Sequence, residues 1–268
     1  MSLRIQNNVE AFNAHRNLAA TGNRLATSME RLSSGYRINR AADDAAGLAI
    51  SERLRGQIGG LDQAQRNVQD AVSLVQTAEG SLTEVHAMLQ RMRELAVQYK
   101  NGSLSANDRG AIQSEVNQLA SEIERIGSSA QFNGINVLNT TQTLSFQVGA
   151  SDGQVISVSL ISLGSQVGTS YFALSQAGAT DIGEIDQAID VVSSQRSTFG
   201  AVQNRLGYTL ENAAIYQENL TASESRIRDV DMASEMVNFT KLQILQQAGT
   251  SMLAQANQSS AGVLTLLR

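Results

Sequence analysis

The sequence predicts a mainly α-helical protein with long antiparallel coiled-coil-like helices, a small β-hairpin region, and N- and C-terminal helices paired as a second domain. Three observations support this fold class. None of the 268 residues is proline, and proline breaks long helices. Apolar residues recur every seven positions over two long stretches, which is typical of coiled coils. Between them lies a nearly uncharged segment with the alternating pattern of strands.

The first segment carries a helical stripe. Apolar side chains recur at spacings of four and three over residues 5–12 and again over residues 25–32, as on one face of an amphipathic helix. The same spacing returns over residues 232–239, and a series with steps of seven runs over residues 230–244. Short helices of this kind are marginal alone, so the two stripes could cover each other or could cover copies of themselves in other molecules. The candidate packing residues on these stripes are Ile5, Val9, Phe12, Leu25, Met29, Leu32, Met232, Met236, Phe239 and Ile244.

A connector follows the first stripe. Gly35 comes shortly after the last periodic residue, Leu32, which is typical of a helix C-cap. Asp43 or Asp44 can then cap the next helix. Paired carboxylates can also serve acid–base catalysis or bind a metal, but no third ligand or nucleophile is nearby, and adjacent helical residues diverge by about 100°. Capping is therefore the preferred interpretation.

The longest predicted helix spans residues 54–99. One apolar series starts at Leu54 and repeats every seven residues, and a second series is offset from it by three. Sustained a and d positions indicate a coiled-coil-like helix, about 68 Å long at the standard rise per residue. Steps of seven recur over residues 185–227. The candidate rod-core residues shared by the two stretches are Leu61, Val68, Leu82, Leu89, Val192, Phe199 and Leu206.

A shorter helix and a hairpin separate these two long stretches. Asn101-Gly102 marks a turn, Ser105 is a candidate N-cap, and Gly127 is a candidate stop for the shorter helix. Residues 131–180 contain Asp152 as their one charged residue. Apolar residues alternate with polar ones on both sides of Asp152-Gly153. This pattern predicts a β-hairpin with its loop at that dipeptide.

Composition argues against several classes of function. The chain has no cysteine, and His15 and His86 are its only histidines. A zinc site would need carboxylates for nearly all its ligands, and a histidine-dependent triad has only two candidate bases. The net charge of −5 disfavours binding to a nucleic-acid backbone, and no apolar run approaches the ~18 residues of a membrane span. Gly59-Gly60 lacks the pattern of a phosphate loop and instead indicates close packing or a bend. We expect no catalytic residue, cofactor, metal, nucleic acid or membrane insertion.

Two long motifs resemble those of a known family. Residues 32–51 read LSSGYRINRAADDAAGLAIS, and residues 218–244 read ENLTASESRIRDVDMASEMVNFTKLQI. They closely resemble the N- and C-terminal signatures of bacterial flagellin, and the resemblance covers about 1–140 and 181–268. One departure is Ser259-Ser260, where many relatives have a proline.

The resemblance implies a non-enzymatic structural subunit that polymerises into the helical flagellar filament for motility. Residues 1–43 with 226–268 would form an inner terminal-helix domain, and residues 44–225 a rod-like domain with the β-hairpin region at about 131–180. The alternative is a flagellar hook–filament junction protein, which shares the terminal helices. A cytoplasmic coiled-coil scaffold would share the heptads but not the two motifs.

The resemblance also implies a location and partners. The first residues, MSLRIQNNVE, show no secretory signal, and members of the family leave the cell unfolded through the flagellar type III system. We therefore expect a secreted protein of the extracellular bacterial flagellum. The implied partners are further copies of the chain, an export chaperone, and the filament cap and hook-junction proteins.

One stretch of the long helix has a further implied role. Met92 and Ala96 belong to the heptad seam, whereas Arg91 and Leu95 do not. The stretch looks like the site on flagellin that a vertebrate Toll-like receptor engages, and Arg91, Leu95 and Glu115 are the matching positions. We expect an exposed Leu95 beside Arg91, a combination suited to an interface anchor. A solvated helix face, or a face for subunit contacts, is the alternative.

Overall fold

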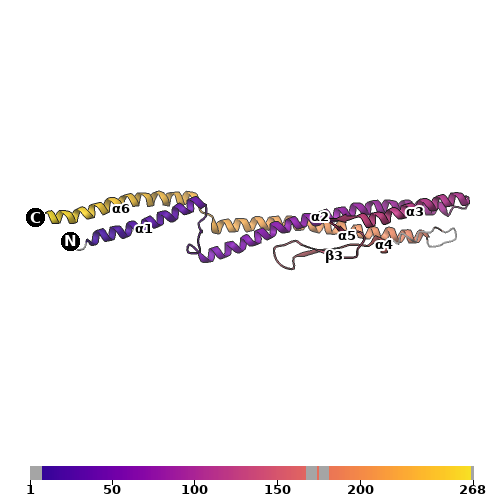
Figure 1. Cartoon of the computed structure of the whole chain (residues 1–268), viewed down its shortest axis with the longest axis horizontal. Helices are drawn as coiled ribbons and strands as arrows, with labels where there is room; N and C mark the ends of the chain where they lie inside the picture. The colour runs from indigo at the N-terminus through magenta and orange to yellow at the C-terminus, as the bar shows by residue number, and fades with distance from the viewer. Residues whose placement is uncertain (1–7, 167–173, 175–180, 267–268) are drawn as a thin grey trace. The chain divides into compact units, whose positions relative to one another are not determined.

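The structure, a computed structural model, describes residues 8–166, 174 and 181–266 (Figure 1). The chain divides into two compact units, a terminal unit of Met1–Gly56 with Asn219–Arg268 and a central unit of Gln57–Glu218. The helices α2 (Ala45–Tyr99) and α5 (Asp181–Arg228) contribute residues to both. The predicted fold class is confirmed, with long helices, a small hairpin region and paired terminal helices.

The terminal unit is built on α1 (Val9–Ser34) and α6 (Met232–Leu266), which lie side by side (Figure 1). Asn8 caps α1, since its side-chain oxygen accepts a hydrogen bond from the Ala11 amide. The same side chain donates to the Ala256 carbonyl of α6 at 2.9 Å. Gly35 ends α1 with a φ of 76° and donates its amide hydrogen to the Arg31 carbonyl, so the predicted C-cap is confirmed.

Two chain segments run antiparallel beside each other where α1 ends and α6 begins. Tyr36 and Asp229 form an isolated antiparallel bridge. The Arg37 amide donates to the Arg228 carbonyl at 2.6 Å, and the Val230 amide donates to the Gly35 carbonyl at 3.0 Å. Backbone hydrogen bonds therefore join the segment that leaves α1 to the segment that enters α6.

Asp43 and Asp44 both accept hydrogen bonds from the backbone near the start of α2. Asp44 accepts the Gly47 amide hydrogen at 2.8 Å, as a capping residue does. Asp43 Oδ2 accepts from the amides of Asn39 and Arg40 at 3.1 and 3.0 Å. These two amide hydrogen bonds lower the pKa of the Asp43 carboxyl below its ordinary value. The capping interpretation of this acidic pair agrees with these contacts.

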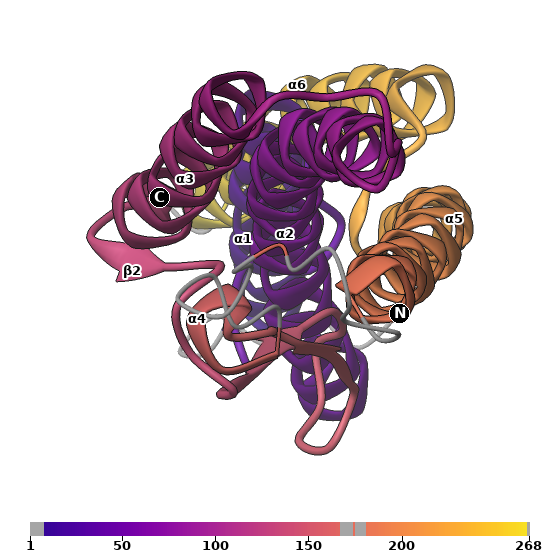
Figure 2. The ribbon, with the colours of Figure 1, turned by 90° about the vertical axis from the view of Figure 1, so that its right-hand side faces the viewer.

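In the central unit, α3 (Ala106–Ser129) and α5 lie on opposite sides of α2 (Figure 2). Ser105 is the N-cap of α3, as predicted, and forms a capping box with Asp108. Gly127 does not end α3, because the helix continues to Ser129. Gly127 is instead buried, and a Cβ there would lie 3.6 Å from the Leu163 side chain. The glycine therefore permits close packing within the helix.

The predicted hairpin is formed by β3 (Thr143–Gln147) and β4 (Val155–Ser159), which pair antiparallel. A smaller hairpin pairs β1 (Gln131–Phe132) with β2 (Ile135–Asn136). Its turn residues, Asn133 and Gly134, both have positive φ. This hairpin was not predicted from the sequence, although Asn-Gly is a strong signal for a two-residue turn. The single-turn helix α4 (Leu163–Gln166) follows β4.

The larger hairpin is fixed to α2 and α5 by polar contacts. Asn67 of α2 donates to the Gln147 carbonyl at 3.1 Å, and Gln195 of α5 donates to the Ser159 carbonyl at 2.9 Å. Its loop also approaches α2 closely, because a Cβ on Gly60 would lie 2.9 Å from the Cβ of Ala150. The glycine at this position thus marks close packing between helix and hairpin.

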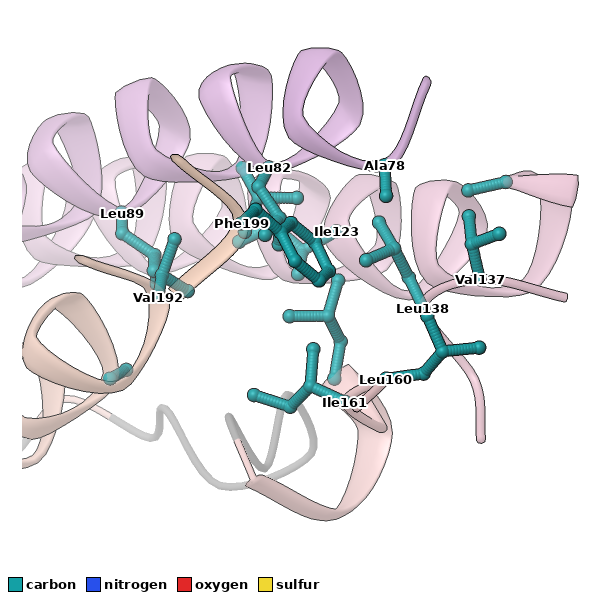
Figure 3. Packing of buried hydrophobic residues seen from close by; sticks show 14 of the residues in the cluster. Ala78, Leu82, Leu89, Ile123, Val137, Leu138, Leu160, Ile161, Val192 and Phe199 are labelled. Atoms are coloured by element: carbon teal, nitrogen blue, oxygen red, sulfur yellow. The ribbon is translucent and has the colours of Figure 1, made fainter. Parts of the chain in front are cut away.

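One apolar core joins the helices and the hairpin of the central unit. Leu82 of α2, Ile123 of α3 and Phe199 of α5 are fully buried and point toward one another (Figure 3). Strand β4 adds Ile156 and Val158 to the same cluster. The structure buries every rod-core candidate from the heptad analysis, namely Leu61, Val68, Leu82, Leu89, Val192, Phe199 and Leu206.

Candidate assembly surface

The two terminal helices bury one side against each other and leave large apolar side chains exposed. Phe12 of α1 is 70% exposed and Ile244 of α6 is 61% exposed. Of the other predicted packing residues, three are half-buried and four are exposed, while Ile5 lies outside the described residues. The half-buried residues are Leu25, Leu32 and Phe239, and the exposed ones are Val9, Met29, Met232 and Met236. So much exposed apolar area on a helix pair is typical of an interaction surface.

The exposed side chains of α6 point in several directions. Met236 and Val237 are adjacent in sequence, so they project about 100° apart on the helix. Together with Thr240, Lys241 and Ile244 they line an apolar hollow of about 420 Å³. A helix that is apolar on several sides is normally buried on several sides, whereas α1 covers one side of α6.

A second groove, of about 620 Å³, runs between α1 and α6. Leu18 and Thr21 of α1 and Leu245 and Met252 of α6 are among its lining residues. The helices approach closely beside it, because a Cβ on Gly249 would lie 3.1 Å from Leu18 Cδ1. The helix pair therefore has apolar surface both in its groove and on the outer side of α6.

A buried polar contact sets the register of the two helices. Ser28 of α1 and Glu235 of α6 are both buried, and the Ser28 hydroxyl donates to Glu235 Oε1 at 2.5 Å. Arg31 Nη1 lies 4.0 Å from Glu235 Oε2. A buried carboxylate costs free energy unless it is hydrogen-bonded, so a slipped pairing that separates Ser28 from Glu235 is disfavoured.

Arg228 connects the end of α5 to the rest of the terminal unit. Its Nη1 donates to Glu52 Oε1 of α2 at 2.8 Å, and its guanidinium carbon lies 4.7 Å from the centroid of the Tyr36 ring. The hydrogen bond from Arg228 is the main cause that lowers the pKa of the Glu52 carboxyl below its ordinary value. The contacts of Arg228 reinforce the backbone hydrogen bonds between the two antiparallel segments.

The predicted receptor-contact residues lie on α2 and α3. Arg91 donates from Nε and Nη2 to Glu115 Oε1 at 3.0 and 2.9 Å, and from Nη1 to Glu94 at 3.2 Å. These acidic partners, Glu115 first, raise the pKa of Arg91 above its ordinary value. The side chains of Arg91 and Glu115 are about half exposed. The structure therefore brings two of the three residues together on the surface.

The expectation that Leu95 is exposed is wrong, because this residue is 1% exposed and belongs to the core. The reason is that α2 packs against two helices, so its apolar stripe is wider than the a and d positions. Leu74, Met88 and Leu95 form a third column, each one residue before an a position. This column was visible in the sequence as further apolar residues at multiples of seven.

Among residues 8–166, 174 and 181–266, no group of three or more His, Cys, Asp or Glu could hold a metal ion. Within that same described part of the chain, no helix combines the length and apolar character needed to cross a membrane.

Comparison with known proteins gives consistent results at the level of family and of whole chains. The bacterial flagellin N-terminal helical region matches residues 5–143, and the bacterial flagellin C-terminal helical region matches residues 182–267. The chain is similar to flagellin of Halalkalibacterium halodurans, at 52% identity with 98% of this chain and 99% of that protein covered. It is also similar to flagellin of Bacillus subtilis, at 46% identity with 99% and 100% covered.

Two further similarities extend this result. The flagellar filament 33 kDa core protein of Treponema phagedenis is 47% identical, with 98% of this chain and 99% of that protein covered. Among solved structures, the crystal structure of Bacillus cereus flagellin has a TM-score of 0.51 and 35% identity. That comparison covers 55% of this chain and 88% of the other.

Proposed function

This chain belongs to the bacterial flagellin family and is a structural subunit of the flagellar filament, and we propose that it polymerises through the apolar faces that α1 and α6 leave exposed. The observation that carries this proposal is the exposure of Phe12, Ile244 and their neighbours on a helix pair whose register is already fixed. Relatives that are named flagellin or flagellar filament core protein favour this role over that of a hook–filament junction protein.

We propose that the chain has the domain organisation of its family and that its terminal helices lie on the inner side of the filament. Residues 1–43 and 226–268 form the inner domain of the filament, and residues 44–225 form the rod-like domain. The apolar surface of α1 and α6 supports this assignment, because such surface is most stable away from water. The chain has no catalytic role and works by head-to-tail self-association, which extends a filament because it does not close into a ring.

Family membership also supports a proposed route and proposed partners. The chain is exported unfolded by the flagellar type III system and functions in the extracellular flagellum. Its partners on that route are an export chaperone, the filament cap and the hook-junction proteins. The absence of cysteine fits this route, since no thiol can form a cross-link outside the cell.

The assembly surface is tested with two single variants of the full chain, Phe12→Ser and Ile244→Ser. Both side chains are exposed in the monomer, so the variants keep the helicity and melting temperature of the wild type. Each should raise the critical concentration for seeded polymerisation by roughly tenfold or more, because the burial of one large apolar side chain contributes about 1.5–3 kcal/mol. Sedimentation measures the critical concentration, and electron microscopy shows whether filaments have formed.

The matched control is Val155→Ser, which removes an exposed apolar side chain from strand β4 of the central unit. It should polymerise at nearly the wild-type critical concentration. If Phe12→Ser and Ile244→Ser polymerise as readily as this control, the exposed faces of α1 and α6 do not form the assembly contact.

A second proposal concerns recognition by a vertebrate Toll-like receptor. The observation that favours it is the half-exposed ion pair of Arg91 and Glu115, which spans α2 and α3. An arginine held in place by a partner loses little side-chain entropy on binding and is a good interface anchor. In this proposal Leu95 supports the surface from the core and does not touch the receptor.

A further inference from the structure

Methionine is distributed unevenly over the two units. Among the residues that the structure describes, the methionines of the terminal helices are between 47 and 65% exposed, whereas those of the central unit lie in or against its core. The terminal group is Met29, Met232, Met236 and Met252, and the central group is Met88 and Met92. Solvent therefore reaches the sulfur-bearing side chains mainly on α1 and α6.

The exposed methionines belong to the surface proposed for assembly. Met236 lines the apolar hollow on α6 together with Val237 and Ile244. Met252 lines the groove between α1 and α6. Met232 precedes Met236 by one helical turn, so both lie on the same side of α6. A chemical change at these sulfur atoms thus alters the polarity of the assembly surface while the core of the central unit keeps its composition.

We propose that Met29, Met232, Met236 and Met252 are oxidation sites at which sulfoxide formation reversibly blocks assembly of the monomer. The inference rests on the proposed assembly surface. The oxidant is a peroxide, with hydrogen peroxide as the simplest case. A lone pair of the thioether sulfur attacks one peroxide oxygen, the S–O bond forms and the O–O bond breaks. The proton on the transferred oxygen passes to the leaving hydroxide, which departs as water. The sulfur loses two electrons and the peroxide gains them.

The sulfoxide acts on assembly through polarity. It converts a flexible apolar side chain into a polar one with a strong hydrogen-bond acceptor. Burial of such a group without a donor carries a large penalty, and the surface that receives it here is apolar. Assembly in turn slows oxidation, because methionines buried between subunits are shielded from peroxide. The switch therefore acts on subunits before they are incorporated.

The test compares full-length monomer before and after mild treatment with hydrogen peroxide. Peptide mapping by mass spectrometry should show fast oxidation at the four terminal-helix methionines and slow oxidation at Met92. Seeded polymerisation, followed by sedimentation and electron microscopy, should then show a critical concentration raised at least about tenfold, the factor that one uncompensated polar group produces. Treatment with methionine sulfoxide reductases A and B should restore polymerisation.

Two variants separate the sites. Replacing all four exposed methionines with leucine conserves volume, so this variant should polymerise and should stay competent after peroxide treatment. The control, Met88→Leu with Met92→Leu, should remain as sensitive to peroxide as the wild type. Reductase rescue of the wild type supplies an independent readout if the fourfold variant assembles poorly.

The outcomes distinguish this inference from the proposed function. If untreated wild type polymerises and fully oxidised wild type polymerises equally well, the oxidation inference is overturned and the assembly surface stands. If untreated protein does not polymerise, or if the Phe12→Ser and Ile244→Ser variants polymerise normally, the proposed surface itself is wrong and the inference falls with it.

Discussion

Arg91 and Arg93 show how neighbouring residues on one helix serve different contacts. Arg91 pairs with Glu115 of α3, whereas Arg93 pairs with Asp186 of α5. All four side chains are about half exposed, and ion pairs at such positions contribute little to folding. Substitution of either arginine therefore reports on binding without a large effect on the fold.

Arg91→Ala should weaken binding of the vertebrate Toll-like receptor by roughly 1–3 kcal/mol, the range expected for an interfacial arginine. Its melting temperature should stay close to that of the wild type. Surface plasmon resonance with monomeric protein measures the binding. Arg93→Ala is the matched control and should bind as the wild type does. Equal binding by both variants would leave Arg91 as part of a solvated helix face.

Asp108 gives the start of α3 a dependence on pH. The hydrogen bond from the Ser105 side chain, and then that from the Ser105 amide, lowers the pKa of the Asp108 carboxyl below its ordinary value. A carboxyl with a lowered folded-state pKa stabilises the fold above its unfolded pKa of about 3.9, and this stabilisation disappears as the pH falls through the folded-state value.

We therefore expect the first turn of α3 to lose protection in acid. Hydrogen exchange of its amides should rise as the pH falls below about 4, after correction for the intrinsic rate. Asp108→Asn should remove this pH dependence, because an amide side chain does not titrate in that range. An unchanged pH profile in the variant would show that another carboxyl controls this helix end.

At the scale of elements, the two adjacent glycines of α2 have different surroundings. A Cβ on Gly59 would meet nothing within 4 Å, whereas a Cβ on Gly60 would lie 2.9 Å from Ala150 Cβ and 3.2 Å from Ala150 Cα. Glycine within a helix is less stable than alanine by roughly 0.5–1 kcal/mol. Alanine should therefore stabilise the helix at position 59, whereas at position 60 the hairpin opposes this stabilisation.

Gly59→Ala should stabilise the protein by about 0.5–1 kcal/mol in urea unfolding. Gly60→Ala should give no such gain and should displace the loop of the β3–β4 hairpin, since the backbone of Ala150 has to move. Hydrogen exchange of the hairpin amides measures that displacement. The close approach of hairpin and helix would be contradicted if the two variants were equally stabilised.

The long helices could be predicted from sequence because their signal is repeated many times. Each a or d residue of α2 adds to the same pattern, so one irregular residue does not hide it. The burial of Leu95 could not be predicted from a and d positions alone, because it depends on how many helices pack against α2. Gly127 was misinterpreted for a similar reason, since its role is set by Leu163, which is remote in sequence.

The candidate assembly surface was only partly accessible from sequence. The spacing of apolar residues located the stripes of α1 and α6, but it did not show which side chains remain exposed once the two helices pair. The contact between Ser28 and Glu235 also gave no sequence signal, because serine and glutamate are common on helix surfaces. Only the pairing of α1 with α6 places these two side chains together in a buried position.

At the scale of the whole molecule, the large apolar core and the surface proposed for assembly lie in different units. The core cluster that contains Leu82, Ile123 and Phe199 lies within the central unit, and the apolar surface proposed for assembly lies on α1 and α6. Stability of the central unit therefore does not require α6. A chain without the assembly surface should remain folded in its central part and lose the ability to polymerise.

Deletion of residues 232–268 tests this division. The shortened chain should keep a cooperative thermal transition measured by circular dichroism, because the core of the central unit is intact. It should form no filaments after seeding, as judged by electron microscopy. Normal filaments from the shortened chain would mean that α6 is dispensable and that the inner-domain assignment is wrong.

The pairing of α1 with α6 also depends on completion of the chain. The hydrogen bond between Asn8 and Ala256 joins residues 248 positions apart in the chain. At about 5–20 residues per second, a ribosome needs on the order of tens of seconds to make the second partner after the first. During that interval α1 has no partner, so the surface proposed for polymerisation is incomplete. A prematurely terminated chain never acquires it, and incorporation into a filament thereby becomes a check that translation has reached α6.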